Sequence, residues 1–364
     1  MTTGLAYDGW VLLGFGGPEH PGEVDDFLER VTAGRGVPRQ RLAEASAHYR
    51  ALGGVSPLNG QNRDLLRALT RALADAGIAL PSALANRNSP PFIPDVVDDL
   101  ARRGCRRLLA VATTPYAGYS SCRQYREDLA AASGRPGRPG DVSVVKLPPY
   151  ADLPGFVRAA ADLVLAALPA DLDIGAATTR LVFTAHSIPV SAAAASGPQG
   201  NAYLVQHRRV ATGIAARIEA ATGRNIPWDL VFQSRSGPVA VPWLEPDVND
   251  HLRRLADGGT ADVVAVPIGF LSDHVEVLWD LDIQARATAA DIGLRLVRTP
   301  TVGTHPAFVA DLATRIAAEL RAGSPAAGPG QCCFGDCCAD PRLARPAVAG
   351  AGAAGPTAAV TPCS

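Results

Sequence analysis

A histidine at the end of an apolar stretch is the first feature of this sequence that suggests chemistry. The stretch that begins at Leu181 runs into Thr184-Ala185-His186-Ser187-Ile188-Pro189. An imidazole titrates near neutral pH, so a histidine at the carboxyl end of a strand can accept a proton from a bound ligand. A structural histidine held by hydrogen bonds fits the same pattern, so position alone leaves both interpretations open.

A row of acidic residues follows a second apolar stretch. If a helix begins near Asp273, then Asp273, Glu276 and Asp280 share one face, because they are three and four residues apart. A row of carboxylates at the end of a strand can pass protons or capture a hydrated cation. Asp273 and Glu276 also resemble a capping box, which stabilises the first turn of a helix without any catalytic role.

Two glycine-rich turns come early in the chain, at residues 14–19 and 53–59. Glycine allows a ligand to approach the backbone closely, but both segments also fit tight turns between a strand and a helix. In the second turn, Ser56 or Asn59 either caps the following helix or faces a ligand. The first turn, Gly14-Phe15-Gly16-Gly17-Pro18-Glu19, is not the GxGxxG pattern of a dinucleotide site.

Aromatic and basic side chains follow two further predicted strands. Tyr116 and Tyr119 either line a flat apolar pocket or belong to the core. Arg235 is suited to binding an anionic substituent, and Trp243 packs either on a ring or in the core. The residue types alone do not separate these alternatives.

The cysteines are unevenly placed. Of seven in the chain, Cys332, Cys333, Cys337 and Cys338 crowd into one short segment near the end, while Cys105 and Cys122 lie in the body. In a reducing compartment such a group favours a metal or an iron–sulfur cluster over disulfides.

Composition excludes several classes of protein. The net charge is -1, so the chain lacks the basic excess of a general nucleic-acid binder. No apolar run reaches the roughly 18 residues of a membrane-spanning helix. The first residues, Met1–Trp10, lack the basic and apolar regions of a signal peptide, which leads us to expect a cytoplasmic protein.

Short apolar runs alternate with amphipathic stretches, which predicts parallel sheets covered by helices on both faces. We expect an α/β fold of two doubly wound domains with parallel four-stranded sheets. The first domain covers residues 1–148 with a returning helix at about 303–322, the second covers 149–302, and 323–364 form a flexible tail rich in Pro, Gly and Ala.

The predicted strands are Val11–Phe15, Leu84–Asn88, Arg107–Thr113, Ser143–Leu147, Leu181–His186, Leu230–Ser234, Asp262–Ile268 and Arg295–Arg298. The predicted helices include Gln61–Ala76, Pro94–Arg103, Leu153–Ala167, Tyr203–Ala221 and His305–Arg321.

Six motifs together resemble the ferrochelatase family over residues 9–322, and their sequences look most like those of its actinobacterial branch. They are Leu-Gly-Phe-Gly-Gly-Pro-Glu (13–19), Gly-Gly-Val-Ser-Pro-Leu-Asn (53–59), Thr-Ala-His-Ser-Ile-Pro (184–189), Phe-Gln-Ser-Arg-Ser-Gly (232–237), Val-Pro-Trp-Leu (241–244) and Gly-Phe-Leu-Ser-Asp-His-Val-Glu-Val-Leu-Trp-Asp-Leu-Asp (269–282). The resemblance implies flavodoxin-like, chelatase-type domains with a porphyrin in the cleft between them.

The resemblance also implies roles for individual residues. His186 matches the active-site histidine of the family and Glu276 its facing carboxylate, so Fe²⁺ is expected near both. Asp280 falls at an acidic position one helical turn further, and His274 has a supporting role. The residues expected to contact substrate are Ser56, Glu19, Tyr116, Tyr125, Arg35, Arg235 and Trp243. Some bacillary relatives carry a tyrosine facing the metal where this chain has Glu19, so a tyrosine ligand to iron is not expected here.

Many ferrochelatases hold a [2Fe–2S] cluster with one internal and three C-terminal cysteines. Cys122 matches the internal position, and Cys333, Cys337 and Cys338 match the C-terminal CxxxCC pattern, with Cys332 as an alternative to Cys333. A four-cysteine zinc site and a disordered thiol-rich tail remain alternatives.

The function that the resemblance implies is insertion of Fe²⁺ into coproporphyrin III to give coproheme, with release of two pyrrole protons. The alternatives are insertion into protoporphyrin IX, a cobalt or nickel chelatase, a non-catalytic tetrapyrrole or iron carrier, and a cluster-based sensor. The expected partners are the porphyrin, ferrous iron and, transiently, neighbouring enzymes of heme synthesis. We expect a monomer.

Overall fold

The computed structural model describes residues 4–34, 36–137, 139–238, 240–322, 337–340 and 345–348. Among the residues with predicted roles, Arg35, Cys332 and Cys333 lie outside these ranges. Most of the predicted tail also lies outside them. Within the described part of the chain, no helix is long and apolar enough to cross a membrane.

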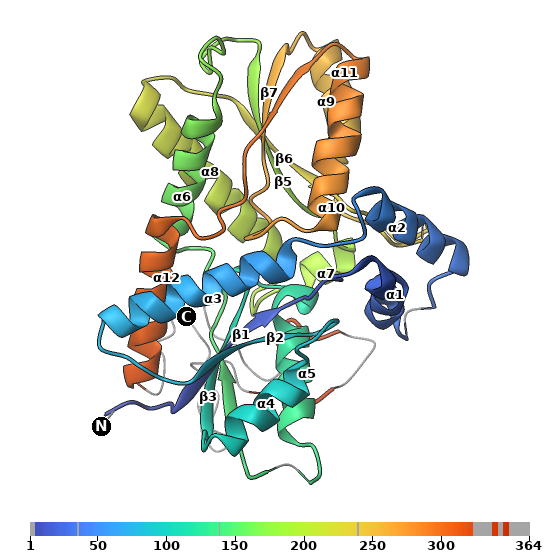
Figure 1. Ribbon diagram of the computed structural model, residues 1–364. Helices are drawn as coiled ribbons and strands as arrows, with labels where there is room; N and C mark the ends of the chain where they lie inside the picture. The colour runs from blue at the N-terminus through green and yellow to red at the C-terminus, as the bar shows by residue number, and fades with distance from the viewer. Residues whose placement is uncertain are drawn as a thin grey trace.

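Two parallel four-stranded sheets form the centre of the molecule (Figure 1). The first has the order β2-β1-β3-β4 and the second the order β6-β5-β7-β8, so the two sheets repeat one topology. The predicted α/β fold with two parallel sheets is therefore confirmed. The strands are β1 (Gly9–Gly14), β2 (Ser82–Asn86), β3 (Arg107–Ala112), β4 (Ser143–Lys146), β5 (Thr179–His186), β6 (Trp228–Gln233), β7 (Asp262–Val266) and β8 (Arg295–Arg298).

The central strands are buried on both faces, as a parallel sheet between two layers of helices requires. Every residue of β1 is buried, and so is nearly every residue of β5. Val, Leu and Ala dominate β1, β3 and β7, because both alternating sets of side chains face helices. The strands therefore read as continuous apolar runs in the sequence.

Helices cover both sheets, and one helix packs against helices of both. Helix α12 contacts α3, beside the first sheet, and α6, beside the second (Figure 1). The predicted division at residue 149, with a helix returning to the first domain, is compatible with these contacts and stays a prediction. The main helices are α1 (Val24–Thr32), α2 (Arg39–Ala51), α3 (Leu58–Asp75), α4 (Ile93–Arg102), α5 (Gln124–Ser133), α6 (Pro154–Ala167), α7 (Val190–Ala194), α8 (Ala202–Thr222), α9 (Val248–Asp257), α10 (Val275–Val277), α11 (Arg286–Asp291) and α12 (Pro306–Ala322).

The carboxyl ends of the two sheets lie against each other. The Gln61 side chain in α3 accepts a hydrogen bond from the Asp273 amide after β7, at 2.9 Å. Val275 packs in a cluster with Phe27 of α1 and Tyr49 of α2. Strand order reverses at β1 and at β5, and ligands of doubly wound sheets bind outside such reversals. The loops after β1 and β5 are therefore where a ligand is expected.

In the segment after β7 a helix begins near Asp273, but the capping box that the sequence offered as an alternative does not form. Helix α10 begins at Val275, with His274 at the N-cap and no side-chain cap, and continues into the π-helix η3 (Leu278–Ala285). The Asp273 carboxylate instead pairs with the Arg298 guanidinium at the end of β8. A nearby buried cation thus outweighs the local capping interaction that the spacing suggested.

Candidate active site

His186 is the last residue of β5, at the reversal of strand order in the second sheet. Its Nε2 lies 3.6 Å from Oε2 of Glu276, and its Nδ1 lies 2.5 Å from the carbonyl oxygen of Ser187. A carbonyl only accepts hydrogen bonds, so the proton of a neutral His186 is on Nδ1 and the lone pair is on Nε2. The side chains of His186 and Glu276 remain 33% and 50% exposed, so a ligand can reach both.

The surroundings of His186 favour its charged form. Burial lowers its pKa, but the hydrogen bond and charge of Glu276, the Ser187 carbonyl and the charge of Asp280 together raise it above the ordinary value. The imidazole therefore binds a proton more readily than an isolated histidine does.

His274 has the opposite character. Burial lowers its pKa, and the charge of His186 acts in the same direction against the opposing charge of Glu276. Its ring makes an edge contact with Phe270, with centroids 5.0 Å apart. The pKa values of the two neighbouring imidazoles are therefore shifted in opposite directions, that of His274 downward and that of His186 upward.

Asp280 lies in the π-helix η3 and is held by two side chains from the end of β6. Ser234 Oγ and Gln233 Nε2 both donate to its Oδ2, the latter over 3.3 Å. Ser234 has a φ of +62°, a conformation that is uncommon for a residue with a side chain. Burial raises the pKa of Asp280 to about 6, although the Ser234 hydrogen bond opposes this shift. Asp280 can therefore change protonation near neutral pH.

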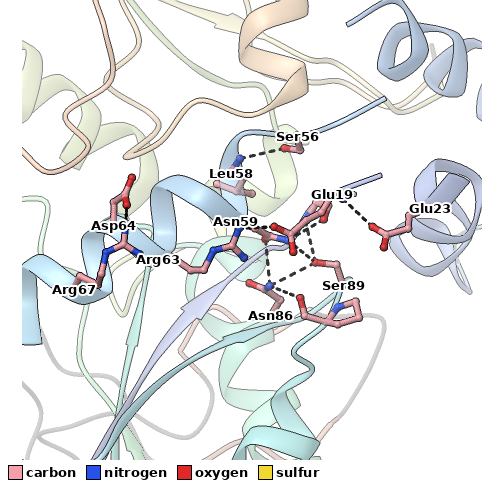
Figure 2. A network of polar contacts seen from close by, with 12 residues as sticks. Glu19, Glu23, Ser56, Leu58, Asn59, Arg63, Asp64, Arg67, Asn86 and Ser89 are labelled. Carbon is pink, nitrogen blue, oxygen red and sulfur yellow. Dashed lines mark hydrogen bonds and ion pairs between the residues drawn. The ribbon is translucent and has the colours of Figure 1, made fainter. Parts of the chain in front are cut away.

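A second group of polar side chains lies at the carboxyl end of β1. Glu19 Oε1 is 2.5 Å from the Arg63 guanidinium of α3, and Glu23 accepts the Glu19 amide at 2.8 Å (Figure 2). The Arg63 hydrogen bond, followed by its charge, holds the pKa of Glu19 below its usual value against the effect of burial. Glu19 is therefore an ionised carboxylate at this edge of the first sheet.

Glycines allow the β1 loop to pack tightly against its neighbours. A Cβ on Gly17 would lie 2.6 Å from the Cβ of Ser56, which is buried. Asn59 Nδ2 donates to the Gly17 carbonyl at 2.9 Å, and Asn86 and Ser89 extend this network beneath the loop (Figure 2). Asn59 therefore anchors the loop and does not cap α3, and a ligand contact of Ser56 or Asn59 stays a prediction.

Arg235 and Trp243 lie in the loop that follows β6. The Arg235 guanidinium donates to carbonyl oxygens of its own loop, at 3.4 Å to Pro238 and 3.2 Å to Val241. The Trp243 indole packs on Gly237, where a Cβ would lie 2.4 Å from the ring, and Trp243 pairs with Pro189 in an isolated β-bridge. Trp243 thus joins this loop to the segment after His186.

Two predicted substrate contacts lie in the core. Tyr116 is 1% exposed and stacks on His207, and Tyr125 is 3% exposed and packs in the first-sheet core, with the Arg87 guanidinium 5.2 Å from its ring centroid. Both rings are buried, so neither forms part of a surface that a substrate can reach. This outcome selects the core alternative that the sequence left open for Tyr116.

The comparisons with known proteins point to one family. The sequence model of the ferrochelatase family matches residues 7–320. This chain belongs to the ferrochelatase family. It is 49% identical over 326 residues to a coproporphyrin III ferrochelatase of Propionibacterium freudenreichii, covering 89% of this chain and 90% of that protein. It is 50% identical over 314 residues to a coproporphyrin III ferrochelatase of Streptomyces griseus, covering 84% and 83%. The solved structure of CbiX, the terminal enzyme of siroheme biosynthesis in denitrifying bacteria, is similar over 86% of this chain and 99% of its own, at 17% identity and a TM-score of 0.47.

This ferrochelatase places three of the predicted cluster cysteines together. Cys122, Cys337 and Cys338 share one buried group with Ala117. The Lys146 ammonium lies 3.4 Å from the Cys122 sulfur, and the Gly197 amide donates to the Cys338 sulfur at 3.0 Å. Both neighbours favour anionic sulfur, which is the form in which a cysteine binds a metal. Within the described ranges, no group of three His, Cys, Asp or Glu side chains is placed to hold a metal ion.

Several residues of the ferrochelatase site were not identified from the sequence. Ser234 and Gln233 lie in a quoted motif, but nothing in the motif shows that they reach Asp280. His48 of α2 stacks on Trp279 of η3, with centroids 4.0 Å apart at 15°. These partners are distant in the sequence, so no periodicity or spacing reveals them.

Proposed function

We propose that this enzyme inserts Fe²⁺ into coproporphyrin III, giving coproheme and releasing two pyrrole protons. The observation that carries the proposal is the His186–Glu276 pair, 3.6 Å apart, where the strand order of the second sheet reverses. The choice of porphyrin rests on relatives that are 49% and 50% identical and are named coproporphyrin III ferrochelatases.

His186 is the base in this proposal. Its Nδ1 is engaged by the Ser187 carbonyl, which leaves Nε2 to accept a proton from a pyrrole nitrogen. Insertion of one divalent cation replaces two N–H protons, so the base must pass on the first proton before it takes the second. The Glu276 carboxylate beside Nε2 is the group that receives it.

Asp280 continues the path of the protons. Its charge affects the pKa of His186, and Glu276 in turn raises the pKa of Asp280, so the three groups are electrostatically coupled. An aspartate with a pKa of about 6 can hold a proton briefly and release it to water at neutral pH. We assign proton release to Asp280, and capture of hydrated Fe²⁺ beside His186 to the more exposed Glu276 carboxylate before it receives a proton.

The cysteine group is proposed to hold a [2Fe–2S] cluster. Cys122, Cys337 and Cys338 would supply three ligands, and Cys333, with Cys332 as the alternative, would supply the fourth. When bound, the cluster would cross-link distant parts of the chain. A redox role is not expected, because insertion of Fe²⁺ transfers no electrons. Lys146 and the Gly197 amide would stabilise the charge of the thiolates. Reduced thiols also fit the proposed cytoplasmic location.

An anaerobic insertion assay tests the proposal. Fe²⁺ is supplied with coproporphyrin III or with protoporphyrin IX, and loss of porphyrin fluorescence is followed. We expect faster turnover of coproporphyrin III. Faster turnover of protoporphyrin IX would keep the enzyme class and change the substrate, while binding without turnover of either would favour a carrier or sensor.

Substitution of His186 tests the assignment of the base. His186→Ala should lower kcat by about 10²–10⁴-fold while porphyrin binding persists, as expected for loss of a general base. His251→Ala is the matched control, because His251 also pairs with a carboxylate, Asp229 at 3.1 Å, but lies on α9 away from this site. Turnover of His186→Ala equal to that of the control would exclude His186 as the base.

A further inference from the structure

Three rings form a buried stack beneath the proposed active site. Tyr116 follows β3 of the first sheet, whereas Tyr203 and His207 lie one turn apart on α8 of the second domain. The His207 ring stacks on the Tyr116 ring, with centroids 3.6 Å apart at an interplanar angle of 14°. The Tyr203 ring packs on His207 at a tilt of 50°, with centroids 4.3 Å apart. Exposed fractions of 1%, 6% and 0% for Tyr116, Tyr203 and His207 show that solvent does not reach the stack.

Each tyrosine hydroxyl of the stack donates to a carbonyl beside the proposed chemistry. Tyr203 Oη donates to the backbone carbonyl of His186 at 2.8 Å. Tyr116 Oη donates to the carbonyl of Ile268, also at 2.8 Å, in the segment that leads from β7 to Glu276. The two hydroxyls thus hold the two strand ends that supply the His186–Glu276 pair.

The two strand ends are themselves in direct contact. The Gly269 amide donates to the Thr184 carbonyl at 3.0 Å, and a Cβ on Gly269 would lie 2.7 Å from the Cα of Ala185. A small shift of either backbone is therefore transmitted to the other. The position of the Nε2 lone pair relative to the Glu276 carboxylate depends on where both ends are fixed.

We propose that the Tyr116–His207–Tyr203 stack is a positioning unit that fixes His186 and the segment leading to Glu276 relative to each other. The proposal rests on the proposed roles of those two residues. None of the three rings touches the substrate; they act through backbone carbonyls. The stack also joins the two domains, since Tyr116 comes from the first and both its partners come from the second.

The histidine in the centre has a specific part in this unit. His207 Nδ1 donates to the Tyr203 carbonyl at 2.7 Å, one turn earlier in α8. Burial lowers the pKa of His207 to about 4, so the ring is neutral and can stack face to face without burying a charge. A phenylalanine would keep the stacking but would leave the carbonyl without this donor.

Removal of single hydroxyl groups separates positioning from packing. Tyr203→Phe and Tyr116→Phe keep the rings and delete only the donors. Tyr150→Phe is the matched control, because Tyr150 is buried and donates to the Ala112 carbonyl at 2.5 Å, at the end of β3 in the first sheet. Iron insertion would be measured with coproporphyrin III, with kcat and KM determined separately and folding checked by thermal unfolding.

We expect Tyr203→Phe and Tyr116→Phe each to lower kcat about tenfold with KM changed less than twofold, because the reacting groups lose alignment while the substrate surface is intact. Tyr150→Phe should stay within twofold of the wild type in kcat. Equal kcat values for Tyr203→Phe and Tyr150→Phe would overturn the positioning role.

A double-mutant cycle distinguishes failure of this inference from failure of the proposed base. If Tyr203 acts through His186, then Tyr203→Phe should have no further effect on the residual rate of His186→Ala. A full tenfold loss in that background would mean that Tyr203 acts elsewhere, and would overturn the inference while His186 remains the base. Wild-type turnover by His186→Ala alone would overturn the base assignment and this inference together.

Discussion

Asp280 is predicted to destabilise the folded enzyme at neutral pH. Burial raises its pKa from 3.8 to about 6, so the folded protein resists ionisation of this carboxyl group more than the unfolded chain does. Between these two pKa values the unfolded state binds fewer protons, and the free energy of unfolding therefore falls as pH rises. Asp280→Asn removes the ionisation and keeps an oxygen that can accept from Ser234.

The size of the effect follows from the shift in pKa. A difference of about two pKa units corresponds to about 3 kcal/mol, because one unit is about 1.4 kcal/mol. Asp280→Asn should therefore raise the free energy of unfolding by up to about 3 kcal/mol at pH 8, and by about 0 below pH 4. Urea unfolding of both proteins across this pH range measures the difference, and iron insertion by the variant should be slower throughout.

Two results would refute this reasoning. One is a stability difference between Asp280→Asn and the wild type that does not change with pH, which would show that the carboxyl group titrates alike in both states. The other is a loss of stability at pH 8. Asp171 is the control of opposite sign: the Arg295 hydrogen bond lowers its pKa, so Asp171→Asn should not stabilise the enzyme at any pH.

Three further substitutions test other parts of the structure. Ser234→Ala removes a hydrogen bond that lowers the pKa of Asp280, so the acidic limb of the kcat–pH profile should move to higher pH. Arg298→Met leaves the Asp273 carboxylate, 18% exposed, without its cation and should cost about 3 kcal/mol of stability in urea unfolding. Gly155→Ala places a Cβ 2.2 Å from the Ala307 carbonyl where α6 meets α12, and should lower the free energy of unfolding by about 1–3 kcal/mol.

Most of the fold could be predicted from the sequence, because each strand is marked by a local run of apolar residues. Eight apolar runs predicted the eight strands, and β8 (Arg295–Arg298) was predicted with its observed bounds. Strand β5 begins two residues earlier than the predicted Leu181, at Thr179. Its first two residues, Thr179 and Arg180, are polar and carry no apolar signal. The order of strands within each sheet follows from no local pattern and had to come from the structure.

The candidate site could be predicted from the sequence only where its residues lie within one segment. His186, Glu276 and Asp280 lie at strand ends or in one helix, so types and spacing made them candidates, and the resemblance to the family implied their roles. Asp273 shows the limit of this reasoning: its spacing to Glu276 left a cap as one alternative, but Arg298, 25 residues away in sequence, pairs with it instead. Contacts between distant segments decide such cases, and a single sequence does not contain them.

Stability and the proposed chemistry conflict at Asp280. Asp280 lies within η3, and the Ser234 hydroxyl, on a residue with a φ of +62°, donates to its carboxylate. Burial of this carboxyl group and the unusual backbone of its partner both cost stability. Their combined effect is an acid with a pKa of about 6 that is coupled to His186. A variant that relaxes either feature should fold more stably and release protons less well, which is the relation expected if this segment is selected for proton transfer and not for packing.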